Sequence, residues 1–182
     1  MCRIEIMWKV SLVGHSQLPW DIEISGAEVR VFRAPGGRAD SFYQDERLYE
    51  VLEWEHDLCI LWLGSNDIED DSHPADIAGR IENIVDNIET SCKAIVHVCL
   101  VEPRFYPGEE YMTHEQYGKI QRGVNKKLRR RLNNEFIQFN SGDWINEISE
   151  DGVHFTEEGK QRVKKRLRKR IKRFMEDDSD SG

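Results

Sequence analysis

The chain lacks the long apolar run that a membrane-spanning helix requires. Its longest apolar run, Leu58 to Leu63, is far shorter than the roughly 20 residues needed to cross a bilayer. The N-terminus carries an acidic residue, Glu5, and no extended apolar stretch, so we expect neither a signal peptide nor a transmembrane segment. These absences predict an intracellular protein, either cytoplasmic or nuclear.

Cysteine is scarce, and its spacing does not suit a metal site. The chain has four cysteines, with no C-x-x-C pair and no His/Cys cluster of zinc-ligand spacing. Cys59 and Cys99 fall in predicted buried strands, where a free thiol behaves as a small apolar residue. We therefore expect a reducing compartment, no metal and no cofactor.

The sequence also lacks an internal repeat, a low-complexity linker and any sign of a second domain. Its 182 residues, 38% hydrophobic and 33% charged, fit one soluble α/β domain with a heavily solvated surface. We expect this domain to span residues 1–175 and an acidic, disordered tail to span residues 176–182.

Strand-like and helix-like segments alternate along the chain. The expected strands are residues 10–13, 28–32, 58–63, 94–101 and 136–139. The expected helices are residues 39–55, 74–92, 113–132 and 155–175, with Asp40 or Ser41 capping the first and Thr156 the last. Repeated β-α units predict a parallel sheet with helices on both faces. Right-handed crossovers place the strand ends along one edge, where ligands bind.

Three polar blocks follow or flank these strands on the ligand-binding edge. They are Gly14-His15-Ser16, Gly64-Ser65-Asn66-Asp67 and Asp151-Gly152-Val153-His154. A serine hydroxyl needs a base, and an imidazole three residues after a carboxylate is a base with its orienting partner. The blocks thus supply a candidate nucleophile (Ser16), base (His154) and orienting carboxylate (Asp151).

An acyl-transfer intermediate also needs donors aimed at its oxyanion, each worth about 3 kcal/mol. We expect these donors to be the backbone N–H groups of Ser16 and Gly36 and the side-chain amide of Asn66. Glycine permits close backbone approach to a ligand. Gly37 is the alternative to Gly36, because the register across the glycine pair is open.

Each block also has a purely structural explanation. Ser16 alone is typical of a loop or cap, the Asp151–His154 spacing of a capping network, and the block at 64–67 of a turn. The order of the blocks and their shared place at strand ends favour an active site over these alternatives.

Taken together, these residues resemble the SGNH hydrolases, also called GDSL-like esterases. The namesake Ser, Gly, Asn and His match Ser16, Gly36, Asn66 and His154, and the resemblance spans roughly residues 10–172. It implies a flavodoxin-like three-layer α/β/α sandwich with a five-stranded parallel sheet. It also implies metal-free hydrolysis of lipid, acetyl-sugar or short acyl esters. The α/β-hydrolase motif Gly-x-Ser-x-Gly fits poorly, because Gln17-Leu18 follows the serine.

One position departs from the family pattern, because His15 stands where the family usually has Asp. That Asp helps to hold the loop around the oxyanion hole and is not the base, so activity can survive its replacement. His15 is either a second proton carrier or a loop-stabilising hydrogen-bond partner, and the second role is favoured. The Gly-His-Ser tripeptide is similar to that of SGNH-like domains in animal retrotransposon-related proteins.

Basic residues are concentrated in two stretches of a chain whose net charge is −8. Ten Lys or Arg and no acid lie between Lys160 and Arg173, and seven more lie between Lys119 and Arg131. These surfaces are either simply solvated, or sites for nucleic acid or anionic lipid, or a nuclear-import signal. No aromatic-rich platform or known nucleic-acid motif accompanies them. Arg104, beyond the fourth strand, is either a solvated loop residue or a contact for a substrate anion.

We therefore predict a serine esterase that cleaves a small acyl or acetyl ester through an acyl-enzyme. The alternative is a catalytically weak SGNH-like module whose basic helices bind RNA or anionic membrane. The joint presence of Ser16, Asn66, Asp151 and His154 favours the esterase.

Overall fold

A five-stranded parallel sheet forms the centre of the computed structural model, which describes residues 7–105, 112–138 and 145–179. The strand order is β2-β1-β3-β4-β5, as in flavodoxin-like folds. This confirms the expected fold class. The strands are β1 (Trp8–Gly14), β2 (Ala27–Arg33), β3 (Leu58–Trp62), β4 (Ile95–Cys99) and β5 (Glu135–Ile137).

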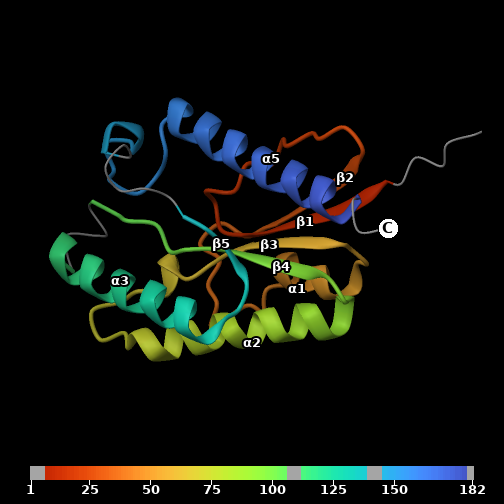
Figure 1. The fold of residues 1–182 in the computed structure, drawn as a ribbon. Coiled ribbons are helices and arrows are strands. Elements are labelled where there is room, and N and C mark those ends of the chain that lie inside the picture. Colours follow the sequence, from red (N-terminus) through yellow and green to blue (C-terminus); the bar gives the residue numbers. More distant parts are fainter. Residues whose placement is uncertain (1–6, 106–111, 139–144, 180–182) are drawn as a thin grey trace, which may run out of the picture.

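Helices cover both faces of the sheet and complete a three-layer sandwich (Figure 1). Helix α5 (Glu157–Ser179) lies on one face. On the other face lie α1 (Glu46–Tyr49), α2 (Pro74–Cys92) and α3 (His114–Arg131). In the described part of the chain, no helix combines the length and apolar character needed to cross a membrane.

Apolar stripes hold the layers together. Strand β3 is buried at all five positions, as expected of a central parallel strand covered on both sides. Helix α5 presents Val163, Leu167 and Ile171 to the sheet, each with no exposed surface. Burying such a side chain contributes roughly 1.5–3 kcal/mol, so this stripe fixes α5 against the sheet and carries the residues just before it into place.

The segment at residues 39–55 does not form the single helix that we expected. It contains turns, the four-residue helix α1 and the 3₁₀ helix η1 (Glu50–Glu53), and Asp45 rather than Asp40 or Ser41 caps α1. The backbone N–H groups of Ala39 and Asp40 donate to the Asp67 carboxylate at 2.8 and 3.0 Å. These long-range bonds hold the start of the segment away from helical geometry.

The C-terminal helix ends later than expected. Thr156 accepts from the N–H of Gly159 at 3.2 Å, as a helix cap does, and α5 then runs to Ser179 instead of ending at residue 175. Residues 176–179, which we placed in a disordered tail, are therefore helical. Residues 180–182, and Phe139 of the expected fifth strand, lie outside the described residues.

Gly14 ends β1 at a point where β1 and β3 approach closely. A Cβ atom at this position would lie 2.3 Å from the carbonyl oxygen of Trp62, its partner on β3. Backbone cannot move aside as a flexible side chain can, so only glycine fits immediately before the loop that carries Ser16.

We expect Gly14→Ala to lower the free energy of unfolding by about 1–3 kcal/mol, the usual effect of forced overpacking. Urea denaturation measures this change. Gly118→Ala in α3 is the control, because its added methyl would meet only the guanidinium end of Arg122, a flexible side chain. Equal destabilisation of the two variants would contradict the claim that the close contact between β1 and β3 requires glycine at position 14.

Candidate active site

The three polar blocks converge at the edge of the sheet where the strands end. Ser16 lies in a turn after β1, closed by a 3.1 Å bond from the N–H of Leu18 to the carbonyl of His15. Asn66 lies in the 3₁₀ helix η2 (Ser65–Asp67), after β3. His154 precedes α5, which is packed on the opposite face of the sheet from α2 and α3.

Asp151 and His154 form the expected carboxylate–imidazole pair. Asp151 Oδ2 lies 2.6 Å from His154 Nδ1, while Oδ1 accepts from the backbone N–H groups of Val153 and His154 at 2.9 and 2.8 Å. Burial raises the pKa of Asp151. The hydrogen bonds from His154, Val153 and Ser149 have a larger effect in the opposite direction, so the pKa lies well below its usual range. The ionised carboxylate therefore holds a proton on Nδ1 and leaves Nε2 as the basic nitrogen.

Ser16 and His154 line one cavity of about 490 Å³. The cavity is also lined by Trp20, by the basic Arg33, Lys160 and Lys164 and by the acidic Asp21 and Glu157, so its wall combines one large aromatic surface with groups of both charges. Within the described structure, Ser16 and His154 share this cavity without a hydrogen bond between them. In enzymes without substrate, such catalytic hydrogen bonds are often long and tighten only when substrate binds.

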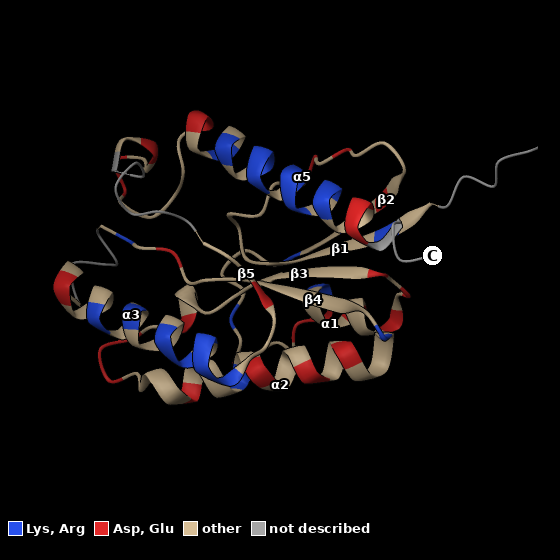
Figure 2. Ribbon diagram, in the orientation of Figure 1, with Lys and Arg blue, Asp and Glu red and all other residues tan. Residues whose placement is uncertain are grey.

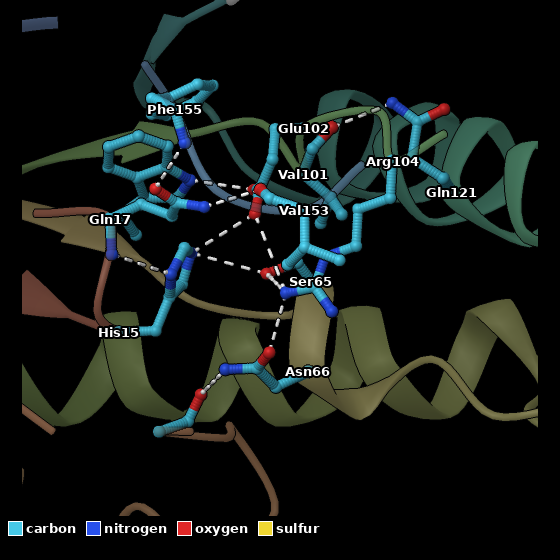
Figure 3. Close-up of polar contacts among 12 residues, drawn as sticks. His15, Gln17, Ser65, Asn66, Val101, Glu102, Arg104, Gln121, Val153 and Phe155 are labelled. Carbon is cyan, nitrogen blue, oxygen red and sulfur yellow. Dashed lines mark hydrogen bonds and ion pairs between the residues drawn. The ribbon is translucent and has the colours of Figure 1, made fainter. Parts of the chain in front are cut away.

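Gln17 ties the nucleophile turn to the histidine loop. Its Nε2 donates to the carbonyl of Val153 at 2.6 Å, and its Oε1 accepts from the N–H of Phe155 at 3.3 Å (Figure 3). These two bonds fix the backbone of the residues on both sides of His154. The Gln17 side chain is itself buried. The amide next to Ser16 thus fixes the position of the base.

His15 is buried beneath the nucleophile turn and contacts the ends of two other strands. Its Nε2 lies 3.3 Å from Ser65 Oγ and 3.4 Å from Glu102 Oε1, while its Nδ1 accepts from the N–H of Gln17 at 3.4 Å. The ring also packs edge-on against Trp62. This burial and these contacts favour the loop-stabilising role over a second proton carrier.

Glu102 is the charged centre of this buried cluster, and the sequence reasoning missed it. The side chain is 2% exposed, and its Oε2 accepts from Trp62 Nε1 at 2.9 Å. Burial raises the pKa of Glu102, but interaction with His15 and with the Arg104 guanidinium outweighs burial and lowers the pKa to about 2. The one feature of the sequence that could have indicated Glu102 is its position directly after the apolar run at 94–101.

Arg104 is not the solvated loop residue of the first expectation, and its contact with a substrate anion stays a prediction. Its side chain is 12% exposed, and Nη2 donates to Ser65 Oγ at 3.0 Å and to Asn66 Oδ1 at 2.6 Å (Figure 3). Because the Asn66 oxygen is held by Arg104, the amide nitrogen is turned toward the glycine loop. There Asn66 Nδ2 donates one hydrogen to the carbonyl of Gly37 at 3.0 Å and keeps a second one.

The glycine loop after β2 is held from both sides. Asp67 accepts from two backbone N–H groups beyond the loop, and the N–H of Gly37 donates to the carbonyl of Ala34 at 2.8 Å. That turn occupies the Gly37 donor, which favours Gly36 over Gly37 for the oxyanion role. Gly36 and Asn66 lie outside the lining of the 490 Å³ cavity, so the structure joins Asn66 to the glycine loop but not to that cavity.

The low pKa of Glu102 predicts an acid-sensitive fold. A carboxyl whose pKa falls from 4.5 to about 2 on folding stabilises the protein above pH 4.5, and this contribution disappears as the pH falls toward 2. We expect wild-type stability to decline in that window more steeply than that of Glu102→Gln, by up to about 1.4 kcal/mol per pH unit. Denaturation at several pH values measures both slopes, with the exposed Glu28→Gln as control. Parallel slopes for the wild type and Glu102→Gln would contradict this account.

The Gln17 bridge predicts a loss of activity without a loss of fold. Gln17→Met keeps the length of the side chain but removes both hydrogen bonds, so we expect an ester-hydrolysis kcat/KM at least about tenfold lower. Gln121→Met, which removes a 2.7 Å bond to the carbonyl of Val101 far from His154, is the control. Unchanged activity in Gln17→Met would show that the bridge does not position the base.

Similarity to known proteins agrees with the fold. The chain is similar to a lipase/acylhydrolase from Enterococcus faecalis (15% identity, TM-score 0.67, covering 91% of this chain and 95% of that one). It is also similar to a carbohydrate esterase family 3 protein from Talaromyces cellulolyticus (14% identity, TM-score 0.67, covering 93% of this chain and 99% of that one). A third similar structure is that of an acetyl xylan esterase (14% identity, TM-score 0.66, covering 87% of this chain and 97% of that one). At these identities the likeness is one of fold.

Sequence comparison gives the family. None of the curated proteins matches the chain, and the narrower resemblance to retrotransposon-related proteins stays a prediction. The GDSL-like lipase/acylhydrolase family, in contrast, matches residues 15–162, which is most of the chain. The chain therefore belongs to the GDSL-like lipase/acylhydrolase family of SGNH-type carboxylic ester hydrolases.

Proposed function

We propose that Ser16, His154 and Asp151 form the catalytic triad of this ester hydrolase. Ser16 Oγ attacks the ester carbonyl while His154 Nε2 takes its proton, and the tetrahedral intermediate then expels the alcohol, which receives that proton. Water attacks the resulting acyl-enzyme with His154 again as base, which releases the acid and restores Ser16. Asp151 orients the imidazole and stabilises its charged form.

The observation that carries this proposal is the paired base at the wall of the cavity that Ser16 lines. Asp151 lies 2.6 Å from His154 Nδ1, and Gln17 holds the histidine loop against the serine turn. A nucleophile and a base that line one cavity, with a carboxylate bonded to the far side of the base, are the minimum set for covalent acyl transfer.

The oxyanion is stabilised, in this proposal, by the N–H groups of Ser16 and Gly36 and by the Asn66 amide. Arg104 supports the assignment of Asn66, because its 2.6 Å bond to Oδ1 fixes which end of the amide faces the glycine loop. A donor held in place before the reaction costs no reorganisation when charge develops, which is why such donors contribute several kcal/mol.

We propose a small acyl or acetyl ester as substrate, in which a sugar is the alcohol part. Two similar structures are an acetyl xylan esterase and a carbohydrate esterase family 3 protein, and both are named for such esters. Trp20 supports the choice, because 73% of its surface is exposed and it lines the cavity beside Ser16. An exposed indole offers a flat apolar face with a polar edge, on which a sugar ring can lie.

The competing proposal is a binding module with little catalysis. The hydrogen bonds that orient His154 and Asn66 disfavour it. Gln17 and Asp151 hold His154 and its loop, and Arg104 holds the Asn66 amide, through buried or charge-assisted bonds. A pure binding surface has no need of an oriented base and a fixed amide donor.

The triad predicts that Ser16→Ala abolishes hydrolysis of p-nitrophenyl acetate, with kcat/KM at least about a thousandfold lower. A fluorophosphonate probe should label the wild type on Ser16 and leave the Ser16→Ala variant unlabelled. Ser25→Ala, an exposed serine away from the cavity, is the matched control and should behave as wild type. Full activity in Ser16→Ala would refute the proposed nucleophile.

A further inference from the structure

A basic groove crosses the open edge of the sheet, away from the ester cavity. Strand β5 is one of the two edge strands, and α3 and α5 lie on either side of it with their Lys and Arg residues (Figure 2). Two hollows, of about 700 and 250 Å³, adjoin at Gln138 just beyond β5. We call the surface formed by these two hollows the edge groove.

The edge groove is lined by cations from both helices. Arg122, Lys126 and Arg129 of α3 line the larger hollow, and Arg166, Lys169 and Arg173 of α5 line the smaller one. No Asp or Glu lines either hollow in the part of the chain that is described. Opposed rows of like charge around a concave surface produce a strong positive potential that attracts a polyanion.

Neutral groups hold two of the cations in the middle of the edge groove, whereas a third, Arg170, pairs with Glu135 at 2.8 Å. Arg129 donates to Gln138 Oε1 at 2.7 Å and lies 5.4 Å above the Phe136 ring, and Arg166 donates to the Gln138 carbonyl. The Gln138 and Phe136 contacts orient the two guanidinium groups and are themselves made by uncharged groups. Lys126 and Lys169 are exposed and have no ion-pair partner among the described residues.

Part of the positive charge elsewhere on α5 is neutralised within the molecule. Lys164 pairs with Asp21 at 2.5 Å and Arg162 pairs with Glu147 at 2.6 Å. At the far end of the edge groove, Arg173 similarly pairs with Asp177 at 3.4 Å. Within the edge groove, no ion pair joins Arg122, Lys126, Arg129 or Lys169 to another described residue, so these four cations keep their charge for a partner.

The edge groove suits a single-stranded nucleic acid better than a membrane. The apolar stripe of α5 is fully buried against the sheet, so this helix has no apolar face to insert into a bilayer. Two partly exposed aromatic rings, Phe136 and Phe105, line the hollows, and unpaired bases stack on such rings. The amide of Gln138 between them can contact a ribose 2′-hydroxyl.

We propose that the edge groove binds single-stranded RNA, with its phosphates between the cations of α3 and α5. Lys126, Arg129, Arg166 and Lys169 contact the backbone, and the rings of Phe105 and Phe136 contact bases. None of these residues lines the 490 Å³ ester cavity, although Arg104, which orients Asn66, also lines the larger hollow.

Fluorescence anisotropy with labelled oligouridylate tests the proposal. Wild-type binding should weaken as salt rises, with a log–log slope of about −0.7 for each phosphate contacted. Lys126→Glu/Lys169→Glu should weaken binding at least about tenfold and flatten that slope. The control, Lys165→Glu/Lys172→Glu, makes the same charge change on α5 outside the groove lining, and it should bind within about threefold of wild type.

Three results would overturn the proposal. They are no saturable binding by the wild type at low salt, an equal loss in both double variants, and preferential binding to phosphatidylserine vesicles. The equal loss would point to net charge rather than the edge groove. Circular dichroism checks the fold of each variant, and p-nitrophenyl acetate hydrolysis should be unchanged in both. An inactive wild type that still binds RNA would count against the esterase and not against the edge groove.

Discussion

One buried carboxylate organises the active edge of this molecule. Glu102 follows β4 and contacts His15 after β1 and Trp62 at the end of β3, so a single side chain joins three strand ends. Because water is excluded, its charge requires nearby positive charge, and the Arg104 guanidinium lies 3.9 Å from its Oε1. The same guanidinium fixes Asn66. Neutralising Glu102 would therefore disturb both the serine turn and the expected oxyanion donor.

The second level of organisation is made by amides and backbone. Gln17 connects the serine turn to Val153 and Phe155, which lie 136 and 138 positions later in the chain. Asp67 connects η2 to the segment after the glycine loop. Parallel strands deliver the loops to one edge, but side-chain hydrogen bonds set their relative positions. His15, which stands where the family usually has Asp, holds the serine turn through Gln17, Ser65 and Glu102.

Local patterns predicted most of the fold. The apolar run at 58–63 and the stripe of α2 identified their elements closely, because a strand or helix buried by the sheet must carry that periodicity. The Asp151–His154 pair was equally visible, since its partners are three residues apart. Glu102, Gln17 and the broken segment at 39–55 were not, because each depends on contacts between residues far apart in the chain. The Arg104 contact with Asn66 belongs to the same class.

The central claim is that these distant loops form one acyl-transfer site, and a structure of the fluorophosphonate adduct tests it most directly. We expect phosphorus bonded to Ser16 Oγ and a phosphoryl oxygen about 2.7–3.1 Å from Asn66 Nδ2 and the Gly36 nitrogen. His154 should face the leaving-group side of the same adduct. An adduct on another residue, or a phosphoryl oxygen turned away from both donors, would contradict the account.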